Sequence, residues 1–340
     1  MQRVLFIAKN GSEYSGGYSG TYSYGSSGLF NSANFVVHML VENGIEAKLE
    51  IVRDNNDIDR EVSKYRPDVV IIEALWVIPS KFLELARLHP AVQWVVRIHS
   101  DLPFLAQEGV SVQWIREYAL QDNVFIGFNS HKTLEAFTYI VPKEKLVYVP
   151  NFFPLKSKHT PNHPSKGVLN IGSFGAIRPL KNQMAQAVAA IRYANDNHHT
   201  LHFHINATRV EKGEEVLKNL RSLFRNSKHR LIEHGWHQHK SFQNILDRMD
   251  VSMCVSLSET FCLVAADSVS LGVPLVCSSE IPWVHSGSIV NPTDSKDIAK
   301  GIRRVLAWKM VYRLLNLRGL KEYNNTAVDV WLKFLKGRSR

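Results

Sequence analysis

Cysteine is scarce in this sequence and long apolar runs are missing, and each absence excludes a class of protein. The three cysteines, Cys254, Cys262 and Cys277, form an odd number without the close spacing of metal ligands. We therefore expect buried, reduced thiols in a cytoplasmic protein. No run of about 18 apolar residues occurs, so no transmembrane helix is expected. Val4–Ala8 is apolar too briefly for a signal peptide and predicts a first buried strand.

Motifs of common metal and hydrolase sites are also missing. The sequence has no Cys-x-x-Cys and no Gly-x-Ser-x-Gly. The segment Asp57-Ile58-Asp59 resembles a metal-binding Asp-x-Asp. It lies where a helix is expected to begin, however, and carboxylates are common at helix starts. The sequence therefore predicts no metal site.

Short apolar runs that alternate with amphipathic stretches predict an α/β protein. Such strands, separated by helices, are typical of parallel sheets that are covered on both faces. The expected strands are Val4–Ala8, Ala47–Val52, Val69–Ile72, Gln93–Ile98, Val124–Phe128, Val147–Val149, Val168–Ser173, Leu201–Ile205, Arg230–Ile232, Val251–Val255 and Pro274–Cys277. The expected helices include Ser32–Glu42, Ile58–Tyr65, Lys132–Tyr139, Asn182–Asn195, Gly213–Phe224, Ser241–Met249 and Cys262–Ser270. We predict two Rossmann-like, doubly wound domains facing a central cleft, with ligands at the carboxyl ends of the strands.

A proline-containing segment divides the chain. Pro154, Pro161 and Pro164 lie close together, and proline neither continues a helix nor feeds a central strand. The expected segments are an N-terminal domain over residues 1–150, a linker over 151–167, a C-terminal domain over 168–310 and a basic C-terminal segment over 311–340.

Positive charge is concentrated in the second half of the chain. The formal net charge is +10, yet residues 1–150 hold 14 lysines and arginines against 17 acidic residues. Residues 151–340 hold 27 basic residues against 14 acidic ones. Such an excess favours a polyanionic partner, either nucleic acid or an acidic membrane surface. A basic surface that only maintains solubility is the alternative.

An acidic pair beside an expected helix start is the strongest sign of a site. Glu259 follows the expected strand Val251–Val255, and Asp267 lies in the helix expected to begin near Phe261 or Cys262. Free backbone N–H groups at a helix start bind anions, with help from the helix dipole. A diphosphate would fit there, with Asp267 near ribose hydroxyls and Glu259 near sugar hydroxyls. The expected backbone contacts are Thr260, Phe261, Cys262, Leu263 and Val264.

This segment, with the Gly272-Val273-Pro274 that follows it, resembles the acidic-x7-acidic motif of retaining glycosyltransferases with the GT-B fold, in particular the family 4-like clan. The resemblance extends over nearly the whole chain. It implies a nucleotide-sugar donor, expected to be a UDP-sugar, and neither a required metal nor a tightly bound cofactor. The family usually has glutamate at both ends of the motif, so Asp267 is a departure that shortens the side chain by one methylene group.

A basic loop after the expected strand Val168–Ser173 resembles the Gly-Arg-x4-Lys element of the same family. Lys181 follows Gly175 at the matching distance, but Ala176 occupies the usual arginine position. Arg178, two residues on, is expected to supply the missing charge. The resemblance implies that these two cations stabilise the leaving diphosphate.

His99, Ser100 and Asp101 follow the expected strand Gln93–Ile98, and strand ends face the ligand in such sheets. The resemblance implies that His99 contacts the donor sugar, with Asp101 orienting this ring or the acceptor. Without the family, a turn residue would be the more common explanation for an isolated histidine. The expected acceptor residues are Ser100 and Asp101.

Two further segments are expected near the donor. Gly16 and Gly17 lie in a glycine-rich stretch after the first strand, where glycine lets a backbone approach phosphate closely. A flexible lid without contacts is the alternative. Trp236 lies in a loop that resembles the family's base-binding loop, although a core position would suit tryptophan equally well.

The resemblance implies retention without a protein nucleophile. The leaving diphosphate itself would take the proton of the acceptor on the same face of the sugar. The expected catalytic residues are His99, Arg178, Lys181 and Glu259.

The acceptor is suggested by a narrower resemblance, to glycosyltransferases encoded by tailed bacteriophages. The segments that carry it are Asp54–Glu61, Ile71–Trp76 and His99–Phe104. Several phage enzymes of this fold modify hydroxymethylated pyrimidines, such as hydroxymethylcytosine, in DNA. The resemblance thus implies double-stranded DNA as partner, in the host cytoplasm, and a flipped or otherwise exposed base. In this fold the last helix crosses back to the N-terminal domain, so the basic segment over 311–340 would lie on the acceptor side.

Three alternatives stay open. A transferase for a cell-envelope glycan or lipid would gather basic and aromatic residues on one helix, for which Trp308, Trp331, Phe334 and Leu335 are candidates. A non-catalytic protein that binds nucleic acid or nucleotides would turn over no nucleotide sugar. A sugar-nucleotide epimerase shares the fold and is more distant.

Overall fold

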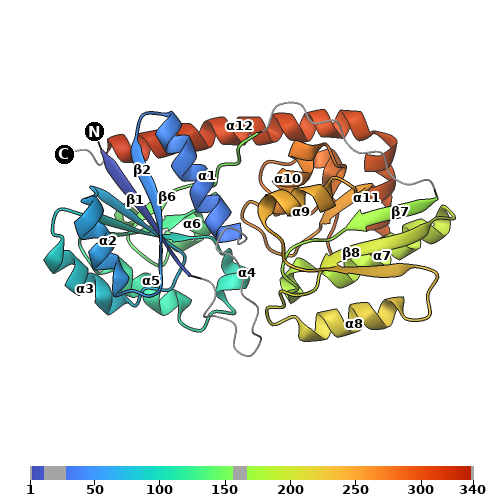
Figure 1. Ribbon diagram of the computed structural model, residues 1–340, viewed down its shortest axis with the longest axis horizontal. Coiled ribbons are helices and arrows are strands. Elements are labelled where there is room, and N and C mark those ends of the chain that lie inside the picture. Colours follow the sequence, from blue (N-terminus) through green and yellow to red (C-terminus); the bar gives the residue numbers. More distant parts are fainter. Residues whose placement is uncertain (1, 11–27, 156–166, 338–340) are drawn as a thin grey trace. The chain divides into compact units, whose positions relative to one another are not determined.

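The computed structural model describes residues 2–10, 28–155 and 167–337 of the chain (Figure 1). The chain divides into two compact units. Unit 1 comprises Met1–Pro154 and Tyr323–Arg340, and unit 2 comprises Leu155–Glu322. Gly16 and Gly17 lie outside the described residues.

Unit 1 contains a six-stranded sheet in the order β2-β1-β3-β4-β5-β6, in which every pairing is parallel. Its strands are β1 (Arg3–Lys9), β2 (Glu46–Val52), β3 (Val69–Glu73), β4 (Gln93–Ile98), β5 (Val124–Phe128) and β6 (Leu146–Tyr148). Its helices are α1 (Gly28–Glu42), α2 (Asp57–Tyr65), α3 (Pro79–Leu88), α4 (Leu102–Leu105), α5 (Ser111–Ala119), α6 (His131–Phe137), η3 (Lys143–Lys145) and the end of α12 (Lys309–Lys336). The central strands are buried on both faces, which explains their nearly continuous apolar sequences.

Two apolar clusters lie on the two faces of this sheet. One contains alternate strand residues with side chains from α2, α3, α5 and α6. The other contains the intervening strand residues with α1 and the end of α12. Trp331 of α12 is fully buried in this second cluster, where its ring lies 5.7 Å from that of Phe6 and its Nε1 donates to the carbonyl of Pro150. The last turns of α12 therefore complete the core of unit 1.

Unit 2 contains a five-stranded parallel sheet in the order β11-β10-β7-β8-β9. Its strands are β7 (Val168–Gly172), β8 (Thr200–Asn206), β9 (Arg230–His234), β10 (Val251–Cys254) and β11 (Leu275–Cys277). Its helices are η4 (Pro179–Lys181), α7 (Gln183–Asp196), α8 (Glu214–Phe224), α9 (His239–Leu246), α10 (Leu263–Leu271), η5 (Ser286–Ser288), α11 (Ser295–Ala307) and the first part of α12.

The first part of α12 packs closely on unit 2. A side chain at Gly319 would come within 2.2 Å of the carbonyl oxygen of Trp283, so only glycine permits this approach. The Asn316 side chain accepts from the backbone N–H of His285 and donates to Ser288. This part of α12 is thus fixed by both packing and polar contacts.

All the expected strands are present within about two residues of their expected ends, and the expected helices are confirmed. The parallel α/β class is confirmed in both units. α10 begins at Leu263, slightly later than Phe261 or Cys262.

Replacing Trp331 with alanine is expected to destabilise the protein strongly. The side chain is fully buried, and such a deletion leaves a cavity that costs ~3–5 kcal/mol. Trp308→Ala is a matched control just before the same helix, because Trp308 is 61% exposed and its loss should change stability by less than ~0.5 kcal/mol. Urea unfolding measures the free energy of unfolding of both variants. An equal loss in the two would contradict the placement of Trp331 in the core.

Candidate functional site

Each sheet has one place where the strand order reverses, and these places lie between β1 and β3 in unit 1 and between β7 and β10 in unit 2. Ligands of open parallel sheets bind beside the carboxyl ends of the strands at such a reversal. Lys181 follows β7 and Glu259 follows β10, and Glu73 ends β3. In each unit taken by itself, topology therefore selects candidate site residues.

In unit 2, Lys181 and Glu259 form an ion pair. The Nζ of Lys181 lies 2.5 Å from Oε1 of Glu259, which also accepts from Ser256 Oγ at 2.9 Å. Burial opposes the charge on Lys181, but the Glu259 carboxylate outweighs it and raises the pKa of the lysine above its usual value. Lys181 thus stays cationic at neutral pH. The pocket at this pair is lined by Ser173, Phe174, Lys181, Gln186, Met253, Cys254, Ser256, Glu259 and Cys262.

The backbone brings the two loops together. The amide of Leu257 donates to the carbonyl of Leu180 at 2.8 Å, and Asn182 donates to the carbonyls of Val255 and Pro292. Gly175 adopts φ of +111°, a conformation that strongly favours glycine. These contacts place Lys181 beside Glu259 although 78 residues separate them.

The start of α10 offers unpaired backbone donors next to this pair. Cys262 holds φ at 63°, outside the helical region, and the first hydrogen bond of the helix runs from Ala266 to the carbonyl of Cys262. The amides of Leu263 and Val264 precede that bond and have no acceptor within the described part of the chain. The neighbouring Cys254 thiol and burial raise the pKa of Cys262, so its thiol is neutral. The site is therefore suited to an anion.

Asp267 is not exposed as a free carboxylate. It is 2% exposed, and its Oδ1 accepts from His239 at 2.8 Å and from Gln243 at 2.6 Å, both on α9. The sequence pattern missed His239 and Gln243, because only the packing of α9 against α10 brings them to this carboxylate. A ribose contact from Asp267 stays a prediction.

The other expected donor residues of unit 2 have protein contacts. Arg178 forms an ion pair with Glu211, which also pairs with Arg209 at 2.5 Å. The guanidinium of Arg209 lies over the ring of Trp236, 4.7 Å from its centroid. Glu211 therefore neutralises part of the positive charge that Arg178 was expected to bring to the diphosphate. Lys181 is the cation beside the start of α10.

In unit 1 a buried network joins the ends of four strands. Arg97 is fully buried and donates to Glu73 Oε1 at 3.0 Å, to the carbonyls of Val149 and Pro150, and to Asn151 Oδ1 at 2.6 Å. Burial alone would raise the pKa of Glu73, but Arg97 and His99 hold it below its usual value. Glu73 is therefore an anion, and no sequence motif distinguishes it from an ordinary residue at a strand end.

His99 is oriented by this network. Its Nε2 lies 2.5 Å from Oε2 of Glu73, and its Nδ1 lies 3.4 Å from Nδ2 of Asn129. Burial lowers the pKa of His99 in spite of the nearby carboxylate, which gives a neutral ring that donates from Nε2 and accepts at Nδ1. A hydrogen bond from His99 to a sugar hydroxyl would have to replace the contact with Glu73.

Asp101 is held by protein contacts, and its expected role toward the acceptor stays a prediction. Its carboxylate accepts from the backbone of Leu102, from Thr133 at 2.8 Å and from Lys132 at 3.2 Å. Asp101 therefore caps α4 and fixes this loop, while Glu73 rather than Asp101 orients His99. The residue Asp101 is 2% exposed. For a direct contact with the acceptor, its carboxylate would have to leave these partners. Ser100 is half-buried beside it.

No helix in the described ranges is long and apolar enough to cross a membrane. Within the same ranges, no group of three or more His, Cys, Asp or Glu side chains could hold a metal ion.

Comparison with known proteins agrees with this geometry. Residues 166–307 match the model of the family described as Glycosyl transferases group 1. The match covers most of unit 2, including Lys181, Glu259 and Asp267. No curated protein sequence matches the chain.

Solved structures share the fold over almost the whole chain. A sucrose-phosphate synthase from Thermosynechococcus elongatus is 14% identical, with 99% of each chain covered and a TM-score of 0.71. A UDP-forming α,α-trehalose-phosphate synthase from Burkholderia xenovorans is 13% identical, with 99% of each chain covered and a TM-score of 0.68. Anabaena Alr3699/HepE, solved in complex with UDP and glucose, is 13% identical, with 99% of each chain covered and a TM-score of 0.66. The fold is therefore GT-B, and the family match places a domain of the glycosyl transferases group 1 in unit 2.

Replacing Glu73 with glutamine is expected to destabilise the protein in a pH-dependent way. The change leaves Arg97 buried without its anion, which costs ~3–5 kcal/mol at pH 7. The folded pKa of Glu73 lies below its ordinary 4.5, so its stabilisation is complete above that pH and is lost as the pH falls further. The difference between parent and variant should therefore shrink in acid.

Urea unfolding at several pH values measures this difference. Glu84→Gln is the control, because Glu84 pairs with Lys81 at a half-exposed position and should contribute at most ~1 kcal/mol. A Glu73→Gln difference of the same size at pH 7 and below pH 4 would contradict the assignment.

Proposed function

We propose that this glycosyltransferase binds a nucleotide-sugar donor in unit 2 and transfers the sugar to a hydroxyl acceptor. The observation that carries the proposal is the Lys181–Glu259 pair beside the open start of α10, at the reversal of strand order. Alr3699/HepE, which shares the fold, was solved with UDP and glucose, and this supports a UDP-sugar donor.

Each group at the proposed donor site has a distinct task. Lys181 and the amides of Leu263 and Val264 bind the diphosphate and stabilise the charge that develops as the sugar leaves. Glu259 binds sugar hydroxyls once the diphosphate shares Lys181. The neutral thiol of Cys262 brings no repulsive charge to the anion.

The proposed transfer proceeds with retention and without a protein nucleophile. Neither Glu259 nor Asp267 is assigned to attack the sugar. Lys181 holds the Glu259 carboxylate, and His239 and Gln243 hold that of Asp267. The bond from the sugar to the diphosphate breaks, the acceptor oxygen bonds to the same carbon, and the proton of the acceptor passes to the leaving diphosphate. His99 is assigned to the donor sugar and Ser100 to the acceptor.

Replacing Lys181 or Glu259 with alanine is expected to lower kcat/KM by about 100-fold or more. Each variant removes an interaction with the donor that strengthens in the transition state. Lys300→Ala removes an exposed lysine of the same unit and should leave turnover near that of the parent. Nucleotide release from a panel of nucleotide sugars measures the effect. Losses below tenfold for both Lys181 and Glu259, or ~1.4 kcal/mol of barrier, would contradict the site.

The acceptor that we propose is a hydroxymethylated pyrimidine in DNA. Its support is the distribution of charge. Unit 1 holds 18 basic and 18 acidic residues, whereas unit 2 holds 23 basic and 13 acidic ones, so unit 2 carries the whole net charge of +10. Long-range attraction of this sign favours a nucleic-acid partner.

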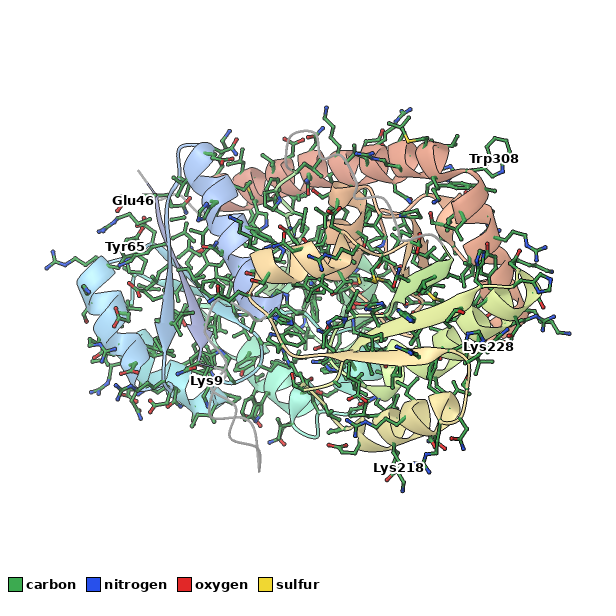
Figure 2. All side chains as sticks on the ribbon, turned by 45° about the vertical axis from the view of Figure 1, so that its right-hand side comes forward. Lys9, Glu46, Tyr65, Lys218, Lys228 and Trp308 are labelled. Atoms are coloured by element: carbon green, nitrogen blue, oxygen red, sulfur yellow. The ribbon has the colours of Figure 1, made fainter. Side chains whose placement is uncertain are left out.

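A lipid-linked acceptor is the second candidate, because one surface patch favours it. Trp308, which joins α11 to α12, and Met310, Val311 and Leu314 at the start of α12 are 46–63% exposed, and Figure 2 shows Trp308 at the surface. Exposed tryptophan beside basic residues is typical of helices that lie at a membrane surface. Trp331 and Leu335, in contrast, are fully buried and cannot serve this purpose.

A donor panel tested with three additions distinguishes these acceptors. Duplex DNA containing hydroxymethylcytosine, the same DNA without it, and anionic vesicles carrying a lipid-linked glycan are each added to the enzyme. The DNA proposal expects a gain of one sugar mass on hydroxymethylcytosine, read by mass spectrometry of the digested nucleosides. Nucleotide release with sugar appearing only on the lipid would replace the DNA acceptor and leave the donor site unaffected.

A further inference from the structure

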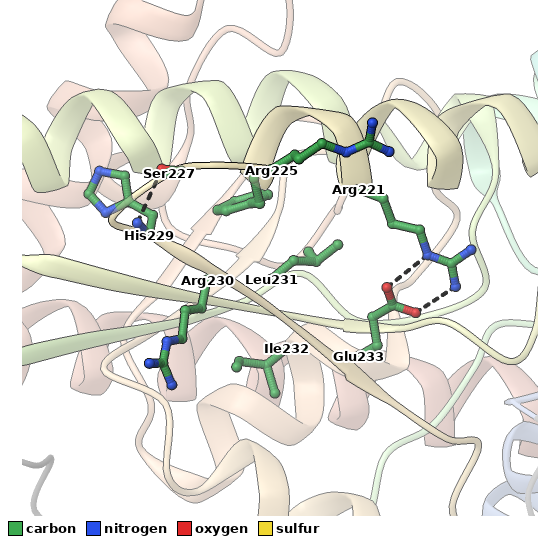
Figure 3. A pocket seen from close by; sticks show the side chains of 9 residues that line it. Arg221, Arg225, Ser227, His229, Arg230, Leu231, Ile232 and Glu233 are labelled. Carbon is green, nitrogen blue, oxygen red and sulfur yellow. Dashed lines mark hydrogen bonds and ion pairs between the residues drawn. The ribbon is translucent and has the colours of Figure 1, made fainter.

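A second concave surface of unit 2 lies between α8 and β9, away from the donor site. It is an open pocket of about 490 Å³. The lining residues are Arg221, Phe224, Arg225, Ser227, His229, Arg230, Leu231, Ile232 and Glu233 (Figure 3). β9 is the edge strand of the sheet, opposite β11. The donor site instead lies at the carboxyl ends of β7 and β10.

Some positive side chains of this pocket are paired with a carboxylate and others are not. Arg221 donates twice to Glu233, from Nε at 2.8 Å and from Nη2 at 2.7 Å, so these two side chains neutralise each other. Arg225, Lys228 and Arg230 are exposed and have no carboxylate partner within the described residues. Figure 2 shows Lys228 at the surface of the same turn. Three positive charges therefore lie within six residues, without a counter-charge.

The buried histidine of the pocket is a structural residue. His229 is 3% exposed, accepts from the amide of Leu201 at Nδ1 and contacts Asn195 through Nε2. Burial, with a contribution from Lys228, lowers its pKa, so it adds no charge at neutral pH. These hydrogen bonds anchor the turn that carries Lys228 and Arg230.

We propose that Arg225, Lys228 and Arg230 form a docking surface for the phosphate backbone of double-stranded DNA. Arginine guanidinium groups bind phosphate oxygens in a bidentate manner, and each cation can replace one counterion of the duplex. The proposal rests on the DNA acceptor proposed above and assigns it a contact outside the donor site.

The pocket favours a phosphodiester chain over a membrane. Its apolar residues, Phe224, Leu231 and Ile232, are buried or half-buried, so no side chain is available to insert among lipids. The start of α12 has the opposite character, with exposed apolar residues. Binding here also leaves Lys181 and α10 free for the donor, so the enzyme can hold both substrates.

The test is the salt dependence of binding to a duplex of about 30 base pairs without hydroxymethylcytosine, measured by fluorescence anisotropy. The variant Arg225→Gln/Lys228→Gln/Arg230→Gln is expected to bind at least about tenfold more weakly at 0.1 M salt. The slope of log K against log salt should fall by about 2.7, since each lost phosphate contact contributes ~0.9. Glu233→Gln should act in the opposite direction, because it releases Arg221 for a further phosphate.

The control Lys300→Gln/Arg303→Gln/Lys309→Gln removes the same charge from another exposed surface of unit 2 and should lower the slope by less than one. Equal losses in the two triple variants would overturn the docking surface, as would an unchanged slope in the first. Binding of the first triple variant to anionic vesicles is also measured. A loss of vesicle binding without a loss of DNA binding would overturn the docking surface.

Nucleotide release without DNA is measured for every variant and should not change. Its absence in the parent would contradict the proposed function, whereas normal release with unaltered DNA binding would contradict only the docking surface. The two failures are therefore distinguishable.

Discussion

A guanidinium that is removed from water must be neutralised and hydrogen-bonded by the protein, and Arg97 imposes this requirement on unit 1. Its partners are the Glu73 carboxylate, two backbone carbonyls and the Asn151 side chain. These groups lie at the ends of different strands, so satisfying one buried charge fixes how the strands end relative to one another. His99 is held by the same carboxylate. The orientation of His99, which we propose contacts the donor sugar, is thus a consequence of the burial of Arg97.

Unit 2 also contains an ion pair at its strand ends, formed by Lys181 and Glu259, but this pair is less buried. Lys181 and Glu259 are partly accessible, and in the donor site that we propose each exchanges its partner for a ligand group. The Arg97–Glu73 pair is fully buried and cannot do so. One ion pair is therefore suited to maintaining a shape and the other to binding a substrate, although both lie at strand ends. A fully buried pair is stable only when its hydrogen bonding is complete.

The sequence was sufficient for the fold because strand and helix periodicities are local properties. Lys181 and Glu259 could be predicted as neighbours of one ligand, since a family motif covers both loops. Glu73 could not, because its task depends on which strand lies beside β3, and strand order is not encoded in any single segment. For the same reason the sequence does not show that Asp101 contacts α4 and α6. The pairing of Arg178 with Glu211 likewise needs the fold, because the two residues come from separate loops.

The division of α12 between the two units has a consequence for the order of folding on the ribosome. Domains usually fold from the N-terminus as they emerge. Unit 1 begins the chain, but its core lacks Trp331 and Leu335 until after all of unit 2 has been synthesised. The unit that is synthesised first would therefore be completed last, because one face of its sheet stays uncovered until the end of α12 has been made. Premature termination within α12 would then expose apolar surface in the half of the protein that was synthesised earliest.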